Sequence, residues 1–263
     1  MKILLSTLIT FFLGFSTAHA ALVKENIEYK DGEAILEGYF VYDDANKEKR
    51  PGVIVVHDWM GLGDYAKRRA DMLAELGYVA FAADIYGKGV RPRDAKEAGA
   101  QAGKYKGDRP VLRSRIGAAL TRLKEHPMVE AGKTGAIGYC FGGTTVLELA
   151  RSGADVTGVV SFHGGLGAGS APDAANIPAK VLVLHGADDP HVPPEEVAAF
   201  MKEMNDANVD WQMVHYADAV HSFSKKEAGN DKASGNAYDE KADKRSWKAM
   251  KVFFKEIFGL ESK

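Results

Sequence analysis

The single cysteine of the chain, Cys140, lies in the stretch GAIGYCFGGTTV, with glycines two residues before and after it. The spacing Gly138-Tyr139-Cys140-Phe141-Gly142 fits the pattern glycine-x-nucleophile-x-glycine, in which a sharp strand-to-helix turn exposes the nucleophile. A thiol at a helix N-terminus is favoured as thiolate, which is the nucleophilic form. The pattern therefore predicts a cysteine nucleophile, with the N–H of Phe141 as one donor of an oxyanion hole.

A cysteine nucleophile needs a base, and the base needs an acidic group that orients it. In this type of turn the acid and then the histidine follow the nucleophile along the chain. Two later stretches offer these groups: VLVLHGADDPHVPPEE carries Asp188 and Asp189, and MVHYADAVHSF carries His215 and His221. These residues alone leave open which aspartate and which of the eight histidines take part.

The elements that would position these residues alternate along the chain. Apolar runs without polar alternation are typical of parallel strands covered on both faces, and they stand at 52–57, 78–84, 134–139, 157–163, 180–186 and 211–217. Helix-favouring segments lie between or after them, at 65–76, 111–126, 144–150, 195–207 and 239–258. The pattern predicts an α/β fold with a doubly wound, mostly parallel sheet.

Two further segments complete the expected organisation. Strand-like runs on both sides of an Asp31-Gly32 turn predict an antiparallel hairpin before the parallel sheet. The stretch 87–108 is rich in glycine and basic residues, and it fits either a flexible flap or a helical insertion. We expect a single domain over residues 21–263.

The first twenty residues have the layout of a cleaved signal peptide. Lys2 precedes an apolar run at 3–15, and Ala18-His19-Ala20 provides a small-residue cleavage site after Ala20. We expect an exported protein, periplasmic or secreted, with no membrane segment after cleavage. Because oxidising compartments favour disulfides and this chain has one cysteine, no disulfide is expected, and the retained thiol indicates that it is used.

Composition excludes several classes of partner. The chain of 263 residues is 46% hydrophobic and has a net charge of -2, without a basic block, so a nucleic-acid surface is not expected. The spacing of histidines and acidic residues matches no metal-binding motif. We expect a small-molecule partner, no metal and no cofactor.

From about Gly52 to Phe258 the sequence resembles the dienelactone hydrolase family of α/β-hydrolases. The resemblance rests on VVHDWMG, GYVAFAADIYG, GAIGYCFGG, LHGADDPHVP and HSF, in this order. It implies an α/β-hydrolase fold that cleaves a small ester or lactone through an acyl-thioester intermediate, with no cofactor. It also implies a Cys-His-Asp triad of Cys140, His221 and Asp189, and a second oxyanion donor in the backbone N–H of Trp59.

The chain departs from the family pattern at two positions. Asp58 stands where the family often has a glutamate close to the nucleophile, and a negative charge there opposes thiolate formation. Lys225 stands where the best-known members have an arginine that binds the substrate carboxylate, and lysine keeps the charge but loses the bidentate fork. Tyr86, Phe223 and Lys88 are further candidates for substrate contacts.

Three points stay open at this level. His163, which ends the run at 157–163, is placed where it could line a pocket. Cys140 could act instead as a redox-active thiol, for which a low pKa and exposure suffice and Asp189 is not needed. The same fold could also serve a binding protein without turnover.

Overall fold

The computed structural model describes residues 22–168 and 174–260. The predicted signal peptide, residues 1–20, lies outside these ranges. Within them, no helix is both long enough and apolar enough to cross a membrane.

Within the described ranges, eight strands form one sheet in the order β1-β2-β4-β3-β5-β6-β7-β8. The first two strands pair antiparallel around the predicted turn, β2 pairs antiparallel with β4, and all other neighbours are parallel. The predicted mostly parallel sheet with an N-terminal hairpin is therefore confirmed. The strands are β1 (Leu22–Asp31), β2 (Ala34–Asp43), β3 (Arg50–Val56), β4 (Val79–Ala83), β5 (Val129–Tyr139), β6 (Gly158–Phe162), β7 (Lys180–Gly186) and β8 (Trp211–Tyr216).

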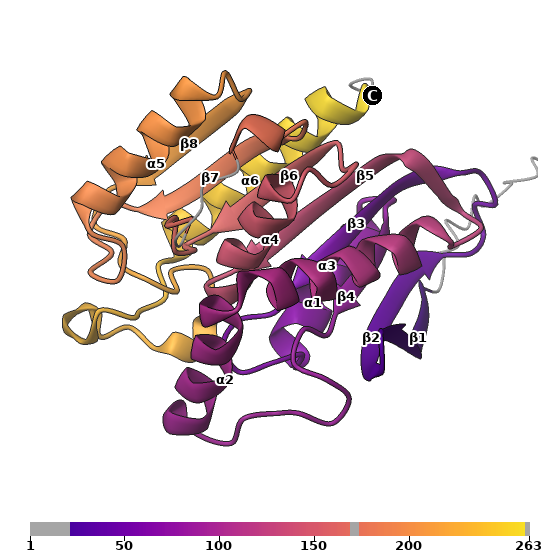
Figure 1. Ribbon diagram of the computed structural model, residues 1–263, viewed down its shortest axis with the longest axis horizontal. Helices are drawn as coiled ribbons and strands as arrows, with labels where there is room; N and C mark the ends of the chain where they lie inside the picture. Colours follow the sequence, from indigo (N-terminus) through magenta and orange to yellow (C-terminus); the bar gives the residue numbers. More distant parts are fainter. Residues whose placement is uncertain (1–21, 169–173, 261–263) are drawn as a thin grey trace, which may run out of the picture.

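Helices cover both faces of the sheet (Figure 1). Helices α2 to α5 pack their buried residues into one core cluster, and α1 and α6 pack into the other. Short 3-10 turns occur at 174–176, 226–228 and 232–234. The helices are α1 (Asp64–Glu75), α2 (Ala95–Gly107), α3 (Arg109–Lys124), α4 (Phe141–Arg151), α5 (Pro194–Asp206) and α6 (Glu240–Phe258).

Strand β3 shows why the apolar runs lack polar alternation. Ile54 and Val56 belong to the core cluster beneath α2 to α5, whereas Val53 and Val55 belong to the cluster beneath α1 and α6. All four side chains are fully buried. Because successive strand residues point to opposite faces, a sheet covered on both sides needs apolar residues at every position.

The stretch 87–108 forms a helical insertion over most of its length. Helix α2 occupies residues 95–107, and its N-terminus is capped by the Asp94 side chain, which accepts from the Glu97 N–H. Asp108 then caps α3 by accepting from the Val111 N–H. The two short polar side chains satisfy N–H groups that a helix start leaves free, so the chain turns directly from one helix into the next.

Most element boundaries lie within two residues of the expected ones, but two starts differ by three residues or more. Helix α4 begins at Phe141 rather than at residue 144, and β5 begins at Val129 rather than at residue 134. The glycines at 142 and 143 are poor helix formers, but here they lie inside the first turn because larger residues do not fit against the neighbouring backbone.

The carboxyl ends of the parallel strands meet at one edge of the sheet, toward the left of Figure 1. Ligand sites of open α/β sheets lie outside this edge. Each parallel strand contributes predicted site residues to its following loop: Asp58 and Trp59 after β3, Tyr86 after β4, Cys140 after β5, His163 after β6, Asp189 after β7 and His221 after β8.

Candidate active site

Cys140 occupies the turn between β5 and α4 in a strained backbone conformation. Its φ is 55° and its ψ is −112°, a region that residues with a Cβ rarely adopt. The turn is tight because glycines bring the two elements together. A Cβ on Gly142 would lie 2.4 Å from the Val56 carbonyl oxygen, and one on Gly138 would lie 2.0 Å from the Gly142 oxygen. Both contacts are closer than van der Waals packing permits.

Three predicted residues lie in one connected chain at this turn. The Nδ1–H of His221 donates to Oδ2 of Asp189 at 2.8 Å. The His221 side chain faces the Cys140 thiol closely enough for the two groups to shift each other's pKa. Asp189 and His221 are both buried, with exposed fractions of 5% and 7%. A histidine that activates a nucleophile needs a carboxylate bonded to one ring nitrogen and the nucleophile on the other side of the ring. His221 has Asp189 and Cys140 in these two places.

The charges of this chain favour an ion pair between thiolate and imidazolium. Burial raises the pKa of the Cys140 thiol, but the charge and hydrogen bond of His221 outweigh burial and bring that pKa below its ordinary value. Burial likewise lowers the pKa of His221, but the Cys140 thiolate and the Asp189 hydrogen bond outweigh it, so that pKa is raised. Each charged partner stabilises the other in a site with little water.

Asp189, not its neighbour, holds the histidine. Its other oxygen, Oδ1, accepts from the His191 N–H at 2.9 Å, which fixes the carboxylate from both sides. The side chain of Asp188 is exposed, and only its backbone N–H is bonded inward, to the Ala219 carbonyl. The loop geometry therefore brings Asp189, the aspartate that the family resemblance implies, to His221 and leaves Asp188 outside.

The two backbone N–H groups predicted for the oxyanion hole are those of Phe141 and Trp59. Phe141 is the first residue of α4, so its N–H has no partner within the helix. Among the described residues, the N–H of Trp59 donates to no recorded acceptor. The Trp59 carbonyl accepts from the Tyr86 hydroxyl at 3.0 Å, and this bond fixes the peptide loop after β3.

Asp58 and Lys225 form an ion pair with each other, across 167 residues of sequence. The second oxygen of Asp58 accepts from the Met60 N–H at 2.8 Å, so both oxygens are occupied. The negative charge of Asp58 still raises the pKa of the Cys140 thiol, but less than His221 lowers it. The two departures from the family pattern are therefore one feature, a short acid paired with a lysine.

Lys106 on α2 was not identified from the sequence, where it is one of several lysines in a basic stretch. Its charge lowers the pKa of the Cys140 thiol, and its Nζ would lie 3.9 Å from a Cβ built on Gly165. The helical insertion brings this ammonium to the thiol. The caps Asp94 and Asp108 mark the bounds of this helix in the sequence, but they do not show which of its lysines faces the thiol.

The remaining predicted contact residues lie in different surroundings. Tyr86 is buried against the rings of His57, Tyr105 and Phe141, and its pKa is raised by burial first and by the Cys140 charge second. Phe223 is fully buried in the core and leaves no surface open to a substrate. The ammonium of Lys88 pairs with Glu28 on β1.

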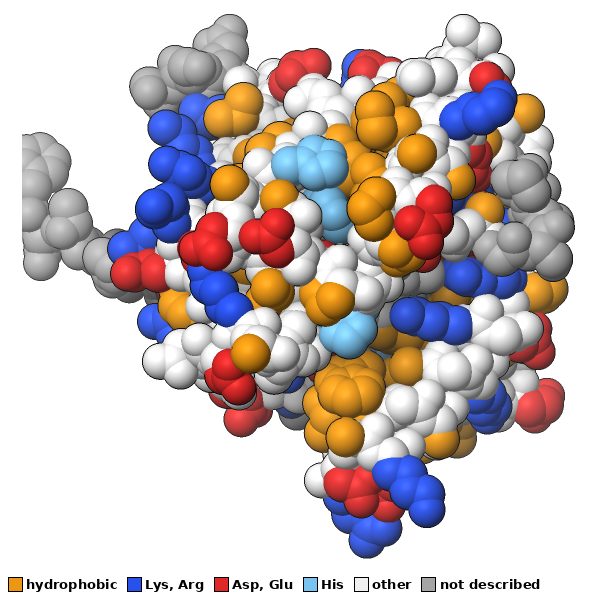
Figure 2. Space-filling model, turned by 90° about the vertical axis from the view of Figure 1, so that its left-hand side faces the viewer, with side chains coloured by type: hydrophobic (Ala, Val, Ile, Leu, Met, Phe, Trp, Pro, Cys, Tyr) orange, Lys and Arg blue, Asp and Glu red, His pale blue; other side chains and the backbone are white. Residues whose placement is uncertain are grey.

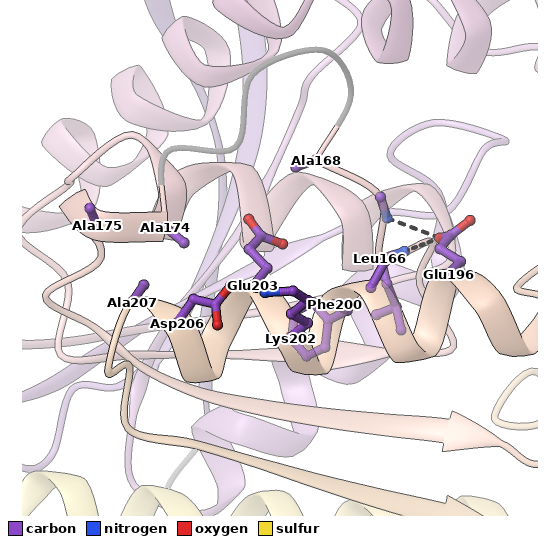
Figure 3. A pocket seen from close by; sticks show the side chains of 12 residues that line it. Leu166, Ala168, Ala174, Ala175, Glu196, Phe200, Lys202, Glu203, Asp206 and Ala207 are labelled. Carbon is purple, nitrogen blue, oxygen red and sulfur yellow. Dashed lines mark hydrogen bonds and ion pairs between the residues drawn. The ribbon is translucent and has the colours of Figure 1, made fainter.

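The face that carries these loops is shown in Figure 2, where histidine side chains gather near the centre among apolar side chains. A cavity of about 650 Å³ lies elsewhere, between α5 and the segment around Leu166 and Ala174 (Figure 3). Its acidic groups are occupied internally, since Glu196 accepts from two backbone N–H groups and Glu203 pairs with Arg151. In the described ranges, no cluster of three or more histidine, cysteine or acidic residues could hold a metal ion.

Comparison with known proteins places these features in a family. The model of the dienelactone hydrolase family matches residues 36–258. A Bradyrhizobium protein carrying the name of a 2-oxo-3-(5-oxofuran-2-ylidene)propanoate lactonase is 32% identical over 66% of this chain and 73% of its own. An Aquifex aeolicus protein carrying the name carboxymethylenebutenolidase is 28% identical over 87% of this chain and 96% of its own.

Solved structures agree with this placement. A dienelactone hydrolase-like promiscuous phosphotriesterase from metagenomic libraries is 45% identical, covers 90% of this chain and 99% of its own, and superposes with a TM-score of 0.86. A dienelactone hydrolase from Anabaena variabilis is 18% identical over 88% of this chain and 97% of its own, with a TM-score of 0.62. At that identity the second structure indicates the fold alone, which is the α/β-hydrolase fold.

Proposed function

Because this chain belongs to the dienelactone hydrolase family and is a lactone or ester hydrolase, we propose that it acts through a Cys140-His221-Asp189 triad. The observation that carries the proposal is the connected chain of buried side chains at the strained turn, from the carboxylate through the imidazole to the thiol. A redox thiol needs no such buried carboxylate behind its histidine.

In the proposed reaction, the thiolate of Cys140 attacks the carbonyl carbon of the ester or lactone. The negative charge that develops on the carbonyl oxygen is stabilised by the free N–H groups of Phe141 and Trp59. Protonated His221 gives its proton to the leaving oxygen, which leaves an acyl-thioester on Cys140. Neutral His221 then takes a proton from water, whose oxygen attacks the thioester and releases the acid and the thiolate.

Asp189 keeps His221 in the orientation and charge state that both steps need. Its hydrogen bond to Nδ1 leaves the other nitrogen free to face the thiol and the leaving group. The buried carboxylate also stabilises the imidazolium present before and during acylation. The residue therefore acts through His221 and does not touch the substrate.

The proposed substrate is a small ester or lactone. The name of the Bradyrhizobium relative makes an unsaturated five-membered lactone the first compound to test, and the name of the metagenomic structure adds a phosphotriester to the panel. With Lys225 and Lys88 both in ion pairs, neither cation is free to bind a substrate carboxylate in the described structure. We propose that the protein works after export, as its N-terminal sequence predicts.

The test is intact-mass spectrometry of the wild type and Cys140→Ala, mixed briefly with activated esters and enol lactones while hydrolysis is followed in parallel. We expect an acyl mass increment on the wild type that decays as product appears and is absent from Cys140→Ala. A wild type that hydrolyses the substrate without an increment, together with an active Cys140→Ala, would contradict the triad. Loss of esterase activity in Asp189→Asn with retained reactivity toward peroxide would argue against the redox alternative.

A further inference from the structure

The loop that carries His221 makes a strained turn directly after it. Ser222 has a φ of 62°, in the left-handed region that residues with a Cβ avoid. The turn closes through a hydrogen bond from the Lys225 N–H to the Ser222 carbonyl at 2.9 Å. A strained turn keeps its shape only when surrounding contacts hold it, so the position of His221 depends on what fastens this loop.

Ser224 is the residue through which this loop is fastened to the rest of the fold. Its carbonyl accepts from the guanidinium of Arg69 at 2.7 Å and from the Tyr65 hydroxyl at 3.2 Å, both on α1. Its hydroxyl lies 2.7 Å from the Tyr65 hydroxyl and 2.7 Å from Nε2 of His163. The serine is 2% exposed, so these bonds form away from water, where an unmade bond is costly.

His163 connects this fastening point with the imidazole of His221. Its ring meets the His221 ring edge-to-face, with centroids 5.2 Å apart, and it meets Phe223 on another side at 5.0 Å. Burial holds the pKa of His163 well below its ordinary value, and the nearby charge of His221 lowers it further. A neutral ring at this place supports a protonated His221 without adding a second positive charge.

The hydrogen-bonding groups fit this neutral state. The Tyr65 hydroxyl carries one proton, which it gives either to the Ser224 carbonyl or to the Ser224 hydroxyl. When the Ser224 hydroxyl accepts it, that hydroxyl is free to donate to an unprotonated Nε2 of His163. One chain of hydrogen bonds then runs from α1 to the end of β6, and the ring at its end lies against His221.

We propose that Ser224 and His163 are positioning residues that hold the His221 imidazole against the Cys140 thiol. The proposal rests on the function proposed above and adds two residues to it. Neither residue touches the reacting atoms. They act through His221, by fixing the turn behind it and the ring beside it.

The readout is the pH dependence of thiol alkylation by iodoacetamide, because thiolate alone reacts and its pKa depends on the distance to protonated His221. If His221 drifts away from Cys140, the thiol pKa rises and the acid limb of the alkylation profile moves to higher pH. The other charged or titratable groups that face Cys140, His221 or the neighbouring His163 ring are Asp58, Arg69, Tyr86, Lys106, His185, Asp189, His191 and Lys225. All of them are unchanged in the variants compared below.

The experiment compares Ser224→Ala with Ser246→Ala in the full chain. Ser246 is also fully buried, but its hydroxyl donates to the Asp243 carbonyl within α6. Both variants lose one buried hydroxyl and one set of hydrogen bonds. We expect Ser224→Ala to shift the acid limb upward by about half a pH unit or more and to lower kcat with little change in KM, while Ser246→Ala leaves the profile unchanged.

Tyr65→Phe provides a second variant in case Ser224→Ala does not fold. It removes one hydroxyl from the same chain and leaves the serine in place, so a smaller shift in the same direction is expected. Equal profiles for the wild type, Ser224→Ala and Tyr65→Phe would overturn the positioning role. That result is separable from failure of the proposed function, because the acyl increment on wild-type Cys140 is measured independently of the alkylation profile.

Discussion

The buried hydrogen bond between Asp189 and His221 leads to a quantitative prediction for Asp189→Asn. The substitution keeps the size of the side chain but removes the charge that faces protonated His221 at 2.8 Å. A hydrogen bond to a charged group contributes about 1.5–3 kcal/mol. About 1.4 kcal/mol corresponds to a tenfold change in an equilibrium constant. The equilibrium between the thiolate–imidazolium pair and the neutral thiol–imidazole pair should therefore shift toward the neutral pair by about 10- to 150-fold.

We therefore expect Asp189→Asn to lower kcat/KM at neutral pH by about 10- to 150-fold. The assay is hydrolysis of an activated phenyl ester between pH 5 and pH 9, with Tm measured on the same samples to separate loss of fold from loss of rate. Asp188→Asn is the matched control, because it removes an adjacent carboxylate whose side chain is exposed.

The comparison has a clear negative outcome. If Asp189→Asn loses no more activity than Asp188→Asn, the charge behind His221 does not support the reaction and the proposed triad is reduced to two residues. If both variants lose activity in parallel with Tm, the loop has been disturbed as a whole, which also contradicts the specific role assigned to Asp189.

Three further predictions concern the thiol, the turn and the N-terminus. Lys106→Met removes a positive charge that lowers the thiol pKa, so the acid limb of iodoacetamide alkylation should move to higher pH, whereas Lys104→Met on the same helix should leave it in place. Gly142→Ala forces a Cβ to 2.4 Å from a strand carbonyl and should destabilise the fold by about 1–3 kcal/mol, measured by chemical denaturation. Gly117→Ala, in open space on α3, should stabilise it by about 0.5–1 kcal/mol, and equal effects would contradict the packing argument. N-terminal sequencing of the protein from expressing cells should begin at Ala21, and a chain that retains Met1 would contradict export by cleavage.

The sheet and the order of its elements could be predicted because the signals are local. An apolar run such as 180–186 identifies a buried parallel strand by itself, and Asp31-Gly32 identifies its hairpin turn. The boundaries were less predictable where tertiary contacts override local preference. Helix α4 extends back to Phe141 through two glycines, because a side chain at 142 would meet the end of β3 and one at 143 would meet Ser161 and Gly164.

Contacts between distant segments could not be predicted in the same way. The ion pair of Asp58 with Lys225 spans 167 residues, and the contact of Tyr65 with Ser224 spans 159. No local pattern shows that a lysine chosen as a substrate contact has an internal partner. Phe223 illustrates the same point, because its aromatic side chain fits a pocket wall and a core equally well in the sequence, and the fold places it in the core.

The positive φ of Cys140 lowers the stability of the fold at the same residue that provides the reactive thiol. A residue with a Cβ in this region costs about 1–3 kcal/mol, and α4, whose residues are all buried, holds it there. Glycine at position 140 would relieve the strain, so Cys140→Gly should be inactive yet more stable than Cys140→Ala. The backbone conformation that exposes the thiol is thus unfavourable by itself and depends on the packing of α4. Any substitution that loosens α4 lets this turn relax before the rest of the protein unfolds.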